Sequence, residues 1–328
     1  MSYTRTTWVD GVTPLSSINM NNIEAGISEI YQIGDIKTTV RTDLGASWLR
    51  CNGDVINEST YPGLSALAFS KPVGTWISNA QGSSDFNSIA HGDDGYWVAV
   101  GVSGTLYYTT DPTGSWTSNA QGSANLFGVT YGNGYWVAVG WSGLMYYKSG
   151  TPAGAWTSST QGTASFWKVK YANGYWVAVS SASGNMYYKA GTPDGTWTSN
   201  AQGSGSFYGV AYDNGYWVAV GSSGSLYYRA LTPNGSWKSN TQGSAVFRSV
   251  MYQDGYWTAV GDSGTLYHKL STPDGTWTSN AQGSAGLNCV SYGDRRWIAA
   301  GSGGVLILAP LYLPTNTRSD AYEYIKAL

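Results

Sequence analysis

The sequence predicts an all-β protein, and three features support this. Among its 328 residues, 44 are Gly, 16 are Trp and 26 are Tyr, a combination typical of short strands joined by tight turns. One segment recurs six times between residues 74 and 309, with a period of 40 or 41 residues. Ala, Leu and Glu at helical spacing are nearly lacking within these copies, so a helical repeat of similar length does not fit.

Two tryptophans and a Gln-Gly-Ser or Gln-Gly-Thr segment between them mark each copy. The first Trp follows Gly-x, and the second comes about 20 residues later. The first series is Trp76, Trp116, Trp156, Trp197, Trp237 and Trp277, the glutamines are Gln81, Gln121, Gln161, Gln202, Gln242 and Gln282, and the second series is Trp97, Trp136, Trp176, Trp217, Trp257 and Trp297. We interpret the tryptophans and tyrosines of the recurring Gly-Tyr-Trp as core residues.

One copy, from Gln202 to Asn240, shows the expected strands. Apolar and aromatic segments alternate with turns that contain Gly or Pro-x-Gly, and the expected strands span 207–212, 216–221, 226–229 and 237–240. Four short strands per ~40 residues, repeated six times, are typical of a six-bladed β-propeller. A β-solenoid is the alternative, but its coils are shorter and carry fewer aromatic residues.

The turn Asp194-Gly195-Thr196-Trp197 resembles the Asp-box turn of sialidase-type propellers and the related YVTN/BNR-like repeats. This resemblance implies that Trp76–Asn79 is the outermost strand of a blade. The last copy ends at its third strand, Val305–Leu308. We therefore expect segment 75–79 to pair with 304–308 and to close the ring.

The flanking segments, 33–73 and 310–328, are expected to form one small β domain into which the propeller is inserted. The segment Trp48-Leu49-Arg50-Cys51-Asn52-Gly53, followed by Tyr61-Pro62 and later by Leu313-Pro314, resembles the phage tail-collar family, and the closing Tyr-Ile-Lys-Ala is similar to the ends of phage tail fibres. The alternative is a small β domain in which residues such as Trp48 and Tyr324 only fill the core.

Residues 1–32 are interpreted as an attachment segment. Trp8–Leu15 resembles the start of many phage tail and fibre proteins, and Ser17 is a candidate N-cap. A short helix over 17–31 is expected because apolar residues follow at spacings of 3, 4 and 3: Met20, Ile23, Ile27 and Ile30. A helix this short is marginal alone, so we expect it to contact a tail protein or its own copies in a homo-oligomer; the resemblance to fibre proteins implies a trimer. The alternative is an amphipathic helix that lies on its own domain.

Composition excludes several other functions. Lys plus Arg total 17 and Asp plus Glu 19, for a formal charge of −2, so we expect no nucleic-acid partner. Two Cys and two His fit neither a disulfide scaffold nor a zinc site, and we expect no metal, no cofactor and no catalytic residue. No apolar run approaches the ~20 residues of a membrane helix, and residues 1–11 show no secretory signal. We expect synthesis in the host cytoplasm and no membrane insertion.

Most positions of the repeat hardly change, whereas two vary widely between copies. One lies six places after each Gln, and the other lies in the turn between the second and third strands. Both belong to the same face of a propeller, and large aromatics there suit stacking on a sugar or protein surface. The candidate receptor-binding residues are Phe127, Trp141, Trp167, Tyr208, Arg248 and Asp262. The alternative is relaxed constraint at exposed loops.

The resulting hypothesis is a structural and adhesive protein of a phage tail, located in the virion. Its N-terminal part would attach to tail or baseplate proteins, and its propeller would bind a host-surface glycan or protein. One alternative is a lectin-like bacterial propeller without a virion role, and another is a glycan-cleaving enzyme with paired carboxylates. The repeated Gln-Gly-Ser segments leave two interpretations open: their Gln links neighbouring blades, or each segment forms a small sugar site.

Overall fold

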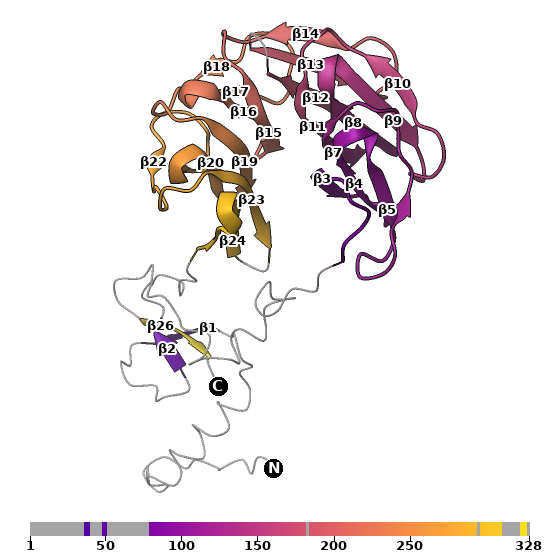
Figure 1. Cartoon of the computed structure of the whole chain (residues 1–328). Coiled ribbons are helices and arrows are strands. Elements are labelled where there is room, and N and C mark those ends of the chain that lie inside the picture. Colours follow the sequence, from indigo (N-terminus) through magenta and orange to yellow (C-terminus); the bar gives the residue numbers. More distant parts are fainter. Residues whose placement is uncertain are drawn as a thin grey trace, which may run out of the picture. The chain divides into compact units, whose positions relative to one another are not determined.

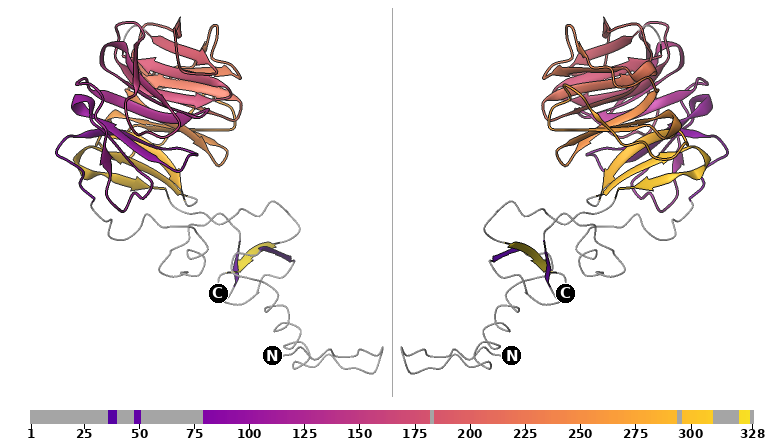
Figure 2. Two further views of the ribbon diagram at one scale, coloured as in Figure 1. Left: turned by 90° about the vertical axis from the view of Figure 1, so that its right-hand side faces the viewer. Right: turned by 90° about the vertical axis from the view of Figure 1, so that its left-hand side faces the viewer.

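The computed structural model of the chain describes residues 36–39, 48–50, 79–181, 184–293, 296–309 and 322–326. These residues belong to two units, and the larger consists of six antiparallel sheets that follow one another along an arc (Figures 1 and 2). The six-bladed, all-β propeller predicted from the sequence is therefore confirmed. Blades one and six are the two ends of the arc in Figure 1.

Each sheet is one blade, and its strands follow in sequence order from the centre of the arc outward. Blade one contains β3 (Phe86–His91), β4 (Trp97–Gly101), β5 (Leu106–Thr109) and β6 (Thr117–Ser118), and blade two contains β7 (Leu126–Gly132), β8 (Tyr135–Gly140), β9 (Leu144–Ser149) and β10 (Thr157–Thr160). Blade three contains β11 (Phe166–Ala172), β12 (Tyr175–Ser180), β13 (Asn185–Ala190) and β14 (Thr198–Ala201), and blade four contains β15 (Phe207–Asp213), β16 (Tyr216–Gly221), β17 (Leu226–Ala230) and β18 (Lys238–Ser239). Blade five contains β19 (Phe247–Gln253), β20 (Tyr256–Gly261), β21 (Leu266–Leu270) and β22 (Thr278–Ser279), and blade six contains β23 (Leu287–Gly293), β24 (Arg296–Gly301) and β25 (Leu306–Leu308).

Blade six has three strands among the described residues, as its sequence predicts. The fourth strand expected for it, 75–79, lies outside the described residues except for Asn79. Its pairing with 304–308 therefore stays a prediction.

The second strand of an inner blade is apolar along its whole length, because the preceding blade covers one of its faces and the following blade covers the other. In β16, every residue from Trp217 to Gly221 is buried. Such a strand reads as a continuous apolar run rather than as an alternating one. The interface between blades three and four shows the packing: Val179 and Met186 of blade three contact a cluster that includes Phe207 and Trp217 of blade four. The expected core role of the second tryptophan series holds at Trp217, which is fully buried.

The repeated Gln-Gly-Ser segments link neighbouring blades. Gln202 follows the outer strand of blade three, and its side-chain Oε1 accepts a hydrogen bond from the backbone N of Trp237 in blade four, at 2.9 Å. Asn200 adds two bonds from its Nδ2, to the carbonyl oxygens of Pro233 and Gly235. The same Gln-to-Trp bond joins blades one and two, two and three, and four and five, and Gln81, which precedes blade one, accepts the corresponding bond from Trp116. Of the two interpretations of this segment, the linking one agrees with these bonds.

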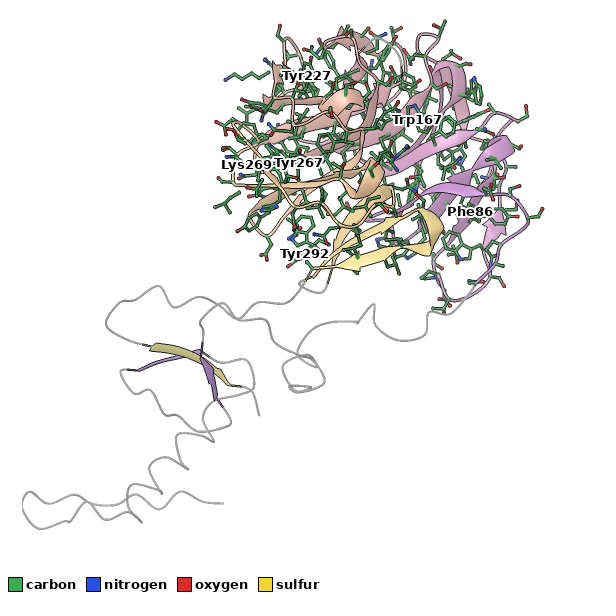
Figure 3. All side chains as sticks on the ribbon, turned by 60° about the vertical axis from the view of Figure 1, so that its left-hand side comes forward. Phe86, Trp167, Tyr227, Tyr267, Lys269 and Tyr292 are labelled. Carbon is green, nitrogen blue, oxygen red and sulfur yellow. The ribbon has the colours of Figure 1, made fainter. Side chains whose placement is uncertain are left out.

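The glycine of this segment is required by its surroundings. Gly203 has a φ of +70°, and a Cβ there would lie 2.3 Å from the hydroxyl oxygen of Tyr227, a residue marked in Figure 3. That tyrosine packs edge-on against Phe207, with ring centroids 5.4 Å apart. A larger residue at Gly203 would displace a ring that belongs to the blade core.

The second unit contains a three-stranded antiparallel sheet with the order β1-β26-β2. Its strands are β1 (Ile36–Thr39), β2 (Trp48–Arg50) and β26 (Tyr322–Lys326). Ile325 in the central strand pairs with Ile36 on one side and with Leu49 on the other. Segments from both flanks of the propeller thus pair in one sheet.

The predicted helix over 17–31, with Met20, Ile23, Ile27 and Ile30, lies outside the described residues. The part of the chain that the structure describes contains short 3-10 turns and no α-helix. Within that part, no helix has the length and apolar character needed to cross a membrane.

Candidate functional site

The two variable positions of the repeat meet at one end of each blade. In blade two, the register between β7 and β8 shifts between Leu126 and Gly128, so Phe127 is the extra residue of a β-bulge. The same shift occurs in blades one, three, four and five. A bulge re-aims a side chain and leaves its residue outside the strand ladder. This position can therefore change between copies without disturbing strand pairing.

Four of the predicted site residues form a continuous row of aromatic rings, which we call the aromatic row: Phe127, Trp141, Trp167 and Tyr208. Phe127 stacks on Trp167 with ring centroids 4.7 Å apart and an interplanar angle of 20°. Trp141 lies 6.4 Å from Phe127, and Tyr208 meets Trp167 edge-on at 5.5 Å. Blades two, three and four contribute to this row, so the ring contacts cross two blade junctions.

The rings of the aromatic row differ in exposure. Trp141, at the start of the 3-10 turn Trp141–Gly143, is 54% exposed. Trp167, marked in Figure 3, is half-buried, and its Nε1 is buried without a hydrogen-bond partner. Since Trp167 already contacts Phe127 and Tyr208, its main effect is to support the row. Trp141 is the ring best placed to stack on a ligand.

The remaining two predicted residues, Arg248 and Asp262, pair with each other. Arg248 donates from Nε to Oδ1 of Asp262 and from Nη2 to Oδ2, the second bond measuring 3.1 Å. The two side chains are 41% and 36% exposed. Arg248 occupies the bulge of blade five, and Asp262 begins the turn that follows β20. No ring contact joins Arg248 to the aromatic row among the residues that the structure describes.

Lys168, next to Trp167 of the aromatic row, is an exception within the repeat that the sequence analysis did not single out. It follows the bulged Trp167 on β11, at a position where the other copies have Ser88, Gly128, Gly209, Ser249 and Cys289. Burial lowers the pKa of its ammonium group. Comparison of the copies at this position would have revealed the exception, because Lys is the one large residue among them.

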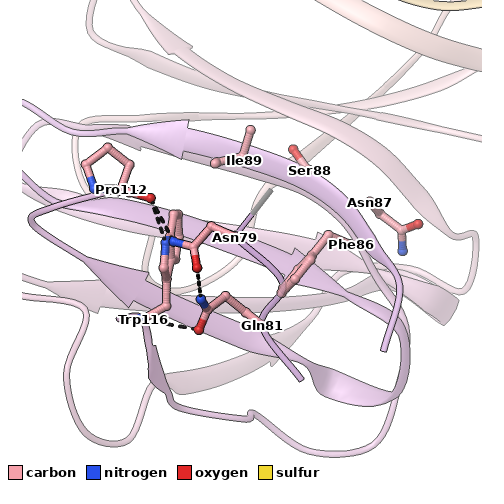
Figure 4. Close-up of a pocket in the computed structure, with 9 residues that line it drawn as sticks. Asn79, Gln81, Phe86, Asn87, Ser88, Ile89, Pro112 and Trp116 are labelled. Carbon is pink, nitrogen blue, oxygen red and sulfur yellow. Dashed lines mark hydrogen bonds between the residues drawn. The ribbon is translucent and has the colours of Figure 1, made fainter. Parts of the chain in front are cut away.

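A hollow of about 400 Å³ lies on the face of blade one that points away from blade two. Figure 4 shows the side chains that line it, among them Phe86, Ile89 and Trp116. The same strand positions in blade three hold Phe166 and Val169, which blade two covers. The hollow therefore matches the space that a neighbouring blade occupies elsewhere in the propeller.

The two histidines lie at unrelated places. His91 is on β3 and packs on Trp97 with ring centroids 4.7 Å apart, whereas His268 is on β21 and faces Tyr256 at 6.2 Å. Within the described ranges, no group of three or more His, Cys, Asp or Glu side chains is arranged to hold a metal ion.

Acidic residues of the outer turns have local roles. Asp194 and Asp274 accept hydrogen bonds from the side chains of Thr192 and Thr272, respectively. These bonds lower the pKa of each carboxyl group. Asp and Thr commonly stabilise turns in this way.

Comparisons with known proteins agree on the fold. No family model matches the sequence, and no curated protein matches it. The WD40 propeller domain of Doa1 is similar in structure at 11% identity, with a TM-score of 0.53, and the match covers 75% of this chain and 93% of that one. The propeller domain of Cps50 (Swd1) from Myceliophteria thermophila is 10% identical, with a TM-score of 0.56 and coverage of 77% and 99%.

A third similar structure is YCF48 from Cyanidioschyzon merolae. It is 16% identical, with a TM-score of 0.55, and the match covers 72% of this chain and 84% of that one. A structure described as YCF48 bound to D1 peptide matches at the same identity. At such identities the likeness shows the fold alone, a propeller, and a fold by itself does not specify a function.

Proposed function

We propose that this chain is a structural and adhesive protein of a phage tail whose propeller binds a receptor on the host surface through the aromatic row. The observation that carries the proposal is the row itself. It is built from the positions that vary between copies of an otherwise repetitive scaffold, and its rings contact one another across blades two, three and four. Aromatic rings at an exposed face suit a glycan or a protein surface.

The role in the virion rests on the flanking segments. The collar-like segment around Trp48–Arg50 and the closing Tyr322–Lys326 carry the resemblance to tail proteins, and their strands pair in one sheet. In the proposed arrangement, the N-terminal part attaches to tail or baseplate proteins, and the chain forms a trimer through Met20, Ile23, Ile27 and Ile30. No enzymatic step is part of the proposal.

The test measures binding of the labelled full chain to a panel of bacterial strains. We expect the wild type to adsorb to at least one strain, and Trp141→Ala to bind at least 10-fold fewer molecules per cell. Leu270→Ala is the matched control because Leu270 is 59% exposed but lies at the end of β21, outside the aromatic row. Both variants should keep the free energy of unfolding within about 1 kcal/mol of the wild type, as is usual for surface changes.

Equal binding by the wild type and by Trp141→Ala would contradict the aromatic row as the receptor site. The lectin-like alternative without a virion role predicts the same loss, because it uses the same rings. Co-purification of the chain with phage particles separates the two: the proposal requires it, and the alternative excludes it.

A further inference from the structure

A second hollow, of about 350 Å³, lies at the junction between blades four and five. It is bounded by the outer strands β17 and β18 of blade four and by the turn that precedes β22 of blade five, strands that are labelled in Figure 1. Its volume is within the range of roughly 300–1,000 Å³ that is usual for small-molecule sites. Blade four contributes Tyr216, Tyr228, Arg229, Ser236 and Lys238 to its lining, and blade five contributes Asp274.

This hollow is at the end of blade four opposite to the aromatic row. Tyr216 begins β16 and pairs with Ala230 at the end of β17. At the other end of β16, Gly221 pairs with Phe207, which precedes Tyr208 of the aromatic row. The hollow and the aromatic row are therefore separate sites.

The strand register places the tyrosines and the lysine on one face of blade four. Tyr228 of β17 is directly opposite Lys238 of β18, and residues directly opposite each other on neighbouring strands project to the same face. Tyr216 belongs to this face too, with its ring centroid 6.2 Å from that of Tyr228. Both rings pack on the apolar cluster that blades four and five share, so the core holds this wall of the hollow in place.

Arg229 and Lys238 give the hollow two positive charges. The guanidinium of Arg229 donates from Nε to the carbonyl oxygen of Thr232 at 3.1 Å, and from Nη1 to that of Ser236 at 2.8 Å. These acceptors are neutral, so they orient the guanidinium without compensating its charge. Among the described residues, no ion pair joins Arg229 or Lys238 to a carboxylate. Both charges are therefore available to an anion.

Asp274 supplies the acceptor on the other side of the hollow. The hydroxyl of Thr272 donates a hydrogen bond to it, which lowers the pKa of its carboxyl group, so this group is ionised at neutral pH. The turn is also held to blade four, because Asn240 donates to the carbonyl oxygens of Pro273 and Gly275 at 2.7 and 2.8 Å. An ionised carboxylate in a fixed place accepts hydrogen bonds from hydroxyl groups.

Comparison of the copies shows that Lys238 is specific to this junction. The other described outer strands have threonine at its position: Thr117, Thr157, Thr198 and Thr278. The position of Asp274 is taken by Ala153 in blade two and by Asn234 in blade four. Blade three has the acidic Asp194 there, but the outer strand of blade two next to it has a threonine. The fold therefore does not require a lysine in this place, because four blades form without one.

We propose that the hollow between blades four and five is a binding site for an acidic sugar, a hexuronate such as glucuronate or galacturonate. Arg229 and Lys238 bind its carboxylate, and Asp274 accepts hydrogen bonds from its hydroxyl groups. The rings of Tyr216 and Tyr228 form the apolar wall against which the sugar ring packs. The two cations exceed the one carboxylate of the hollow by a single positive charge, which matches the single negative charge of a hexuronate. This site does not depend on the proposed adhesive role.

The test compares the full-length wild type with Lys238→Thr, which restores the residue of the other outer strands. Lys170→Thr is the matched control, because it removes the same charge from an exposed position of β11 in blade three. Each protein is titrated with glucuronate, galacturonate, glucose and acetate in separate arms at constant ionic strength, and calorimetry gives the dissociation constants. We expect at least one hexuronate to bind the wild type and Lys170→Thr equally well, and to bind Lys238→Thr about 10-fold or more weakly, because a charge-assisted bond is lost. Glucose and acetate should bind the wild type more weakly than that hexuronate, since each lacks one part of it.

A second variant, Asp274→Ala, separates recognition of the hydroxyl groups from recognition of the charge. Blade two has Ala153 at this position, and its turn keeps the bond from Nε1 of Trp156 to the carbonyl oxygen of Pro152. The variant should bind the hexuronate roughly 3-fold more weakly, because an acceptor is lost, and acetate no more weakly than the wild type does.

Three results would overturn the proposal. They are the absence of hexuronate binding to the wild type, equal affinity of the hexuronate for the wild type and Lys238→Thr, and equal affinity of the wild type for acetate and the hexuronate. The last result would show a site for any small anion rather than for an acidic sugar. None of the three bears on adsorption to cells through Trp141, so the two proposals fail independently.

Discussion

Blades one and three each have an apolar face directed toward the preceding position in the ring, and among the described residues only the face of blade three is covered by another blade. In blade three, Phe166 is fully buried and Val169 is 6% exposed, because Val139 and Met145 of blade two pack on them. In blade one, the equivalent Phe86 is 41% exposed and Ile89 is 56% exposed. At the other end of the arc, Leu306 of blade six is 57% exposed, although Met145 at its equivalent position is 1% exposed.

The difference shows that a blade carries its apolar faces in its own sequence but cannot bury them alone. Stability of a repeat protein comes from each unit and from its contacts with neighbours. The inner blades have two neighbours each, whereas the end blades lack one among the described residues. Substitutions at equivalent positions should therefore have unequal effects along the chain.

The largest effect is expected inside the covered faces. Trp217→Ala should lower the free energy of unfolding by about 3–5 kcal/mol, because it removes a fully buried indole between blades three and four. Urea unfolding of the full chain measures this, and Trp141→Ala, at an exposed tryptophan, provides the control with a change of about 1 kcal/mol or less. A loss below about 1 kcal/mol for Trp217→Ala would contradict its placement in the core.

The pair Phe166 and Phe86 tests the comparison directly. Phe166→Ala should cost about 3–5 kcal/mol, and Phe86→Ala should cost about 1 kcal/mol, because part of its ring stays in water in both states. Both values come from urea unfolding of the full chain. Equal losses would contradict the unequal burial of the two rings and would indicate that another part of the chain covers the face of blade one. The predicted pairing of 75–79 with 304–308 closes the ring and therefore requires such a cover.

The linking glutamines should show the same inequality on a smaller scale. Gln202 is 7% exposed and accepts the N–H of Trp237 at 2.9 Å, whereas Gln81 is less buried and accepts that of Trp116 at 3.4 Å. Gln202→Ala leaves a buried N–H without an acceptor and should cost about 1–3 kcal/mol; Gln81→Ala should cost less than 1 kcal/mol. The two variants are compared by their unfolding midpoints in urea, and a larger loss for Gln81→Ala would contradict the graded effect.

Much of the fold could be predicted from the sequence because each turn and core position is repeated. The strands expected at 207–212 and 216–221 correspond to β15 (Phe207–Asp213) and β16 (Tyr216–Gly221), since turn residues and Trp fix their ends. The fourth strand was less accurate: β18 spans Lys238–Ser239 rather than 237–240. Short outer strands end where hydrogen bonding to the neighbouring strand stops, and sequence pattern alone does not set that point.

The candidate site was only partly predictable, because a residue's type does not specify its neighbours. Variation between copies indicated both Trp141 and Trp167, but the sequence does not tell an exposed ring from one that supports others. The pairing of Arg248 with Asp262 depends on the bulge, which brings together residues 14 positions apart.

The smallest effect is expected at this ion pair. A double-mutant cycle of Arg248→Ala, Asp262→Ala and the double variant should give a coupling energy of about 0.2–1 kcal/mol, because both side chains are more than one-third exposed and water screens their attraction. Unfolding in urea at low salt measures the four proteins, and the coupling should decrease as NaCl is added. A coupling energy well above about 1 kcal/mol that is insensitive to salt would contradict this prediction. It would show that residues outside the described part of the chain shield Arg248 and Asp262 from water.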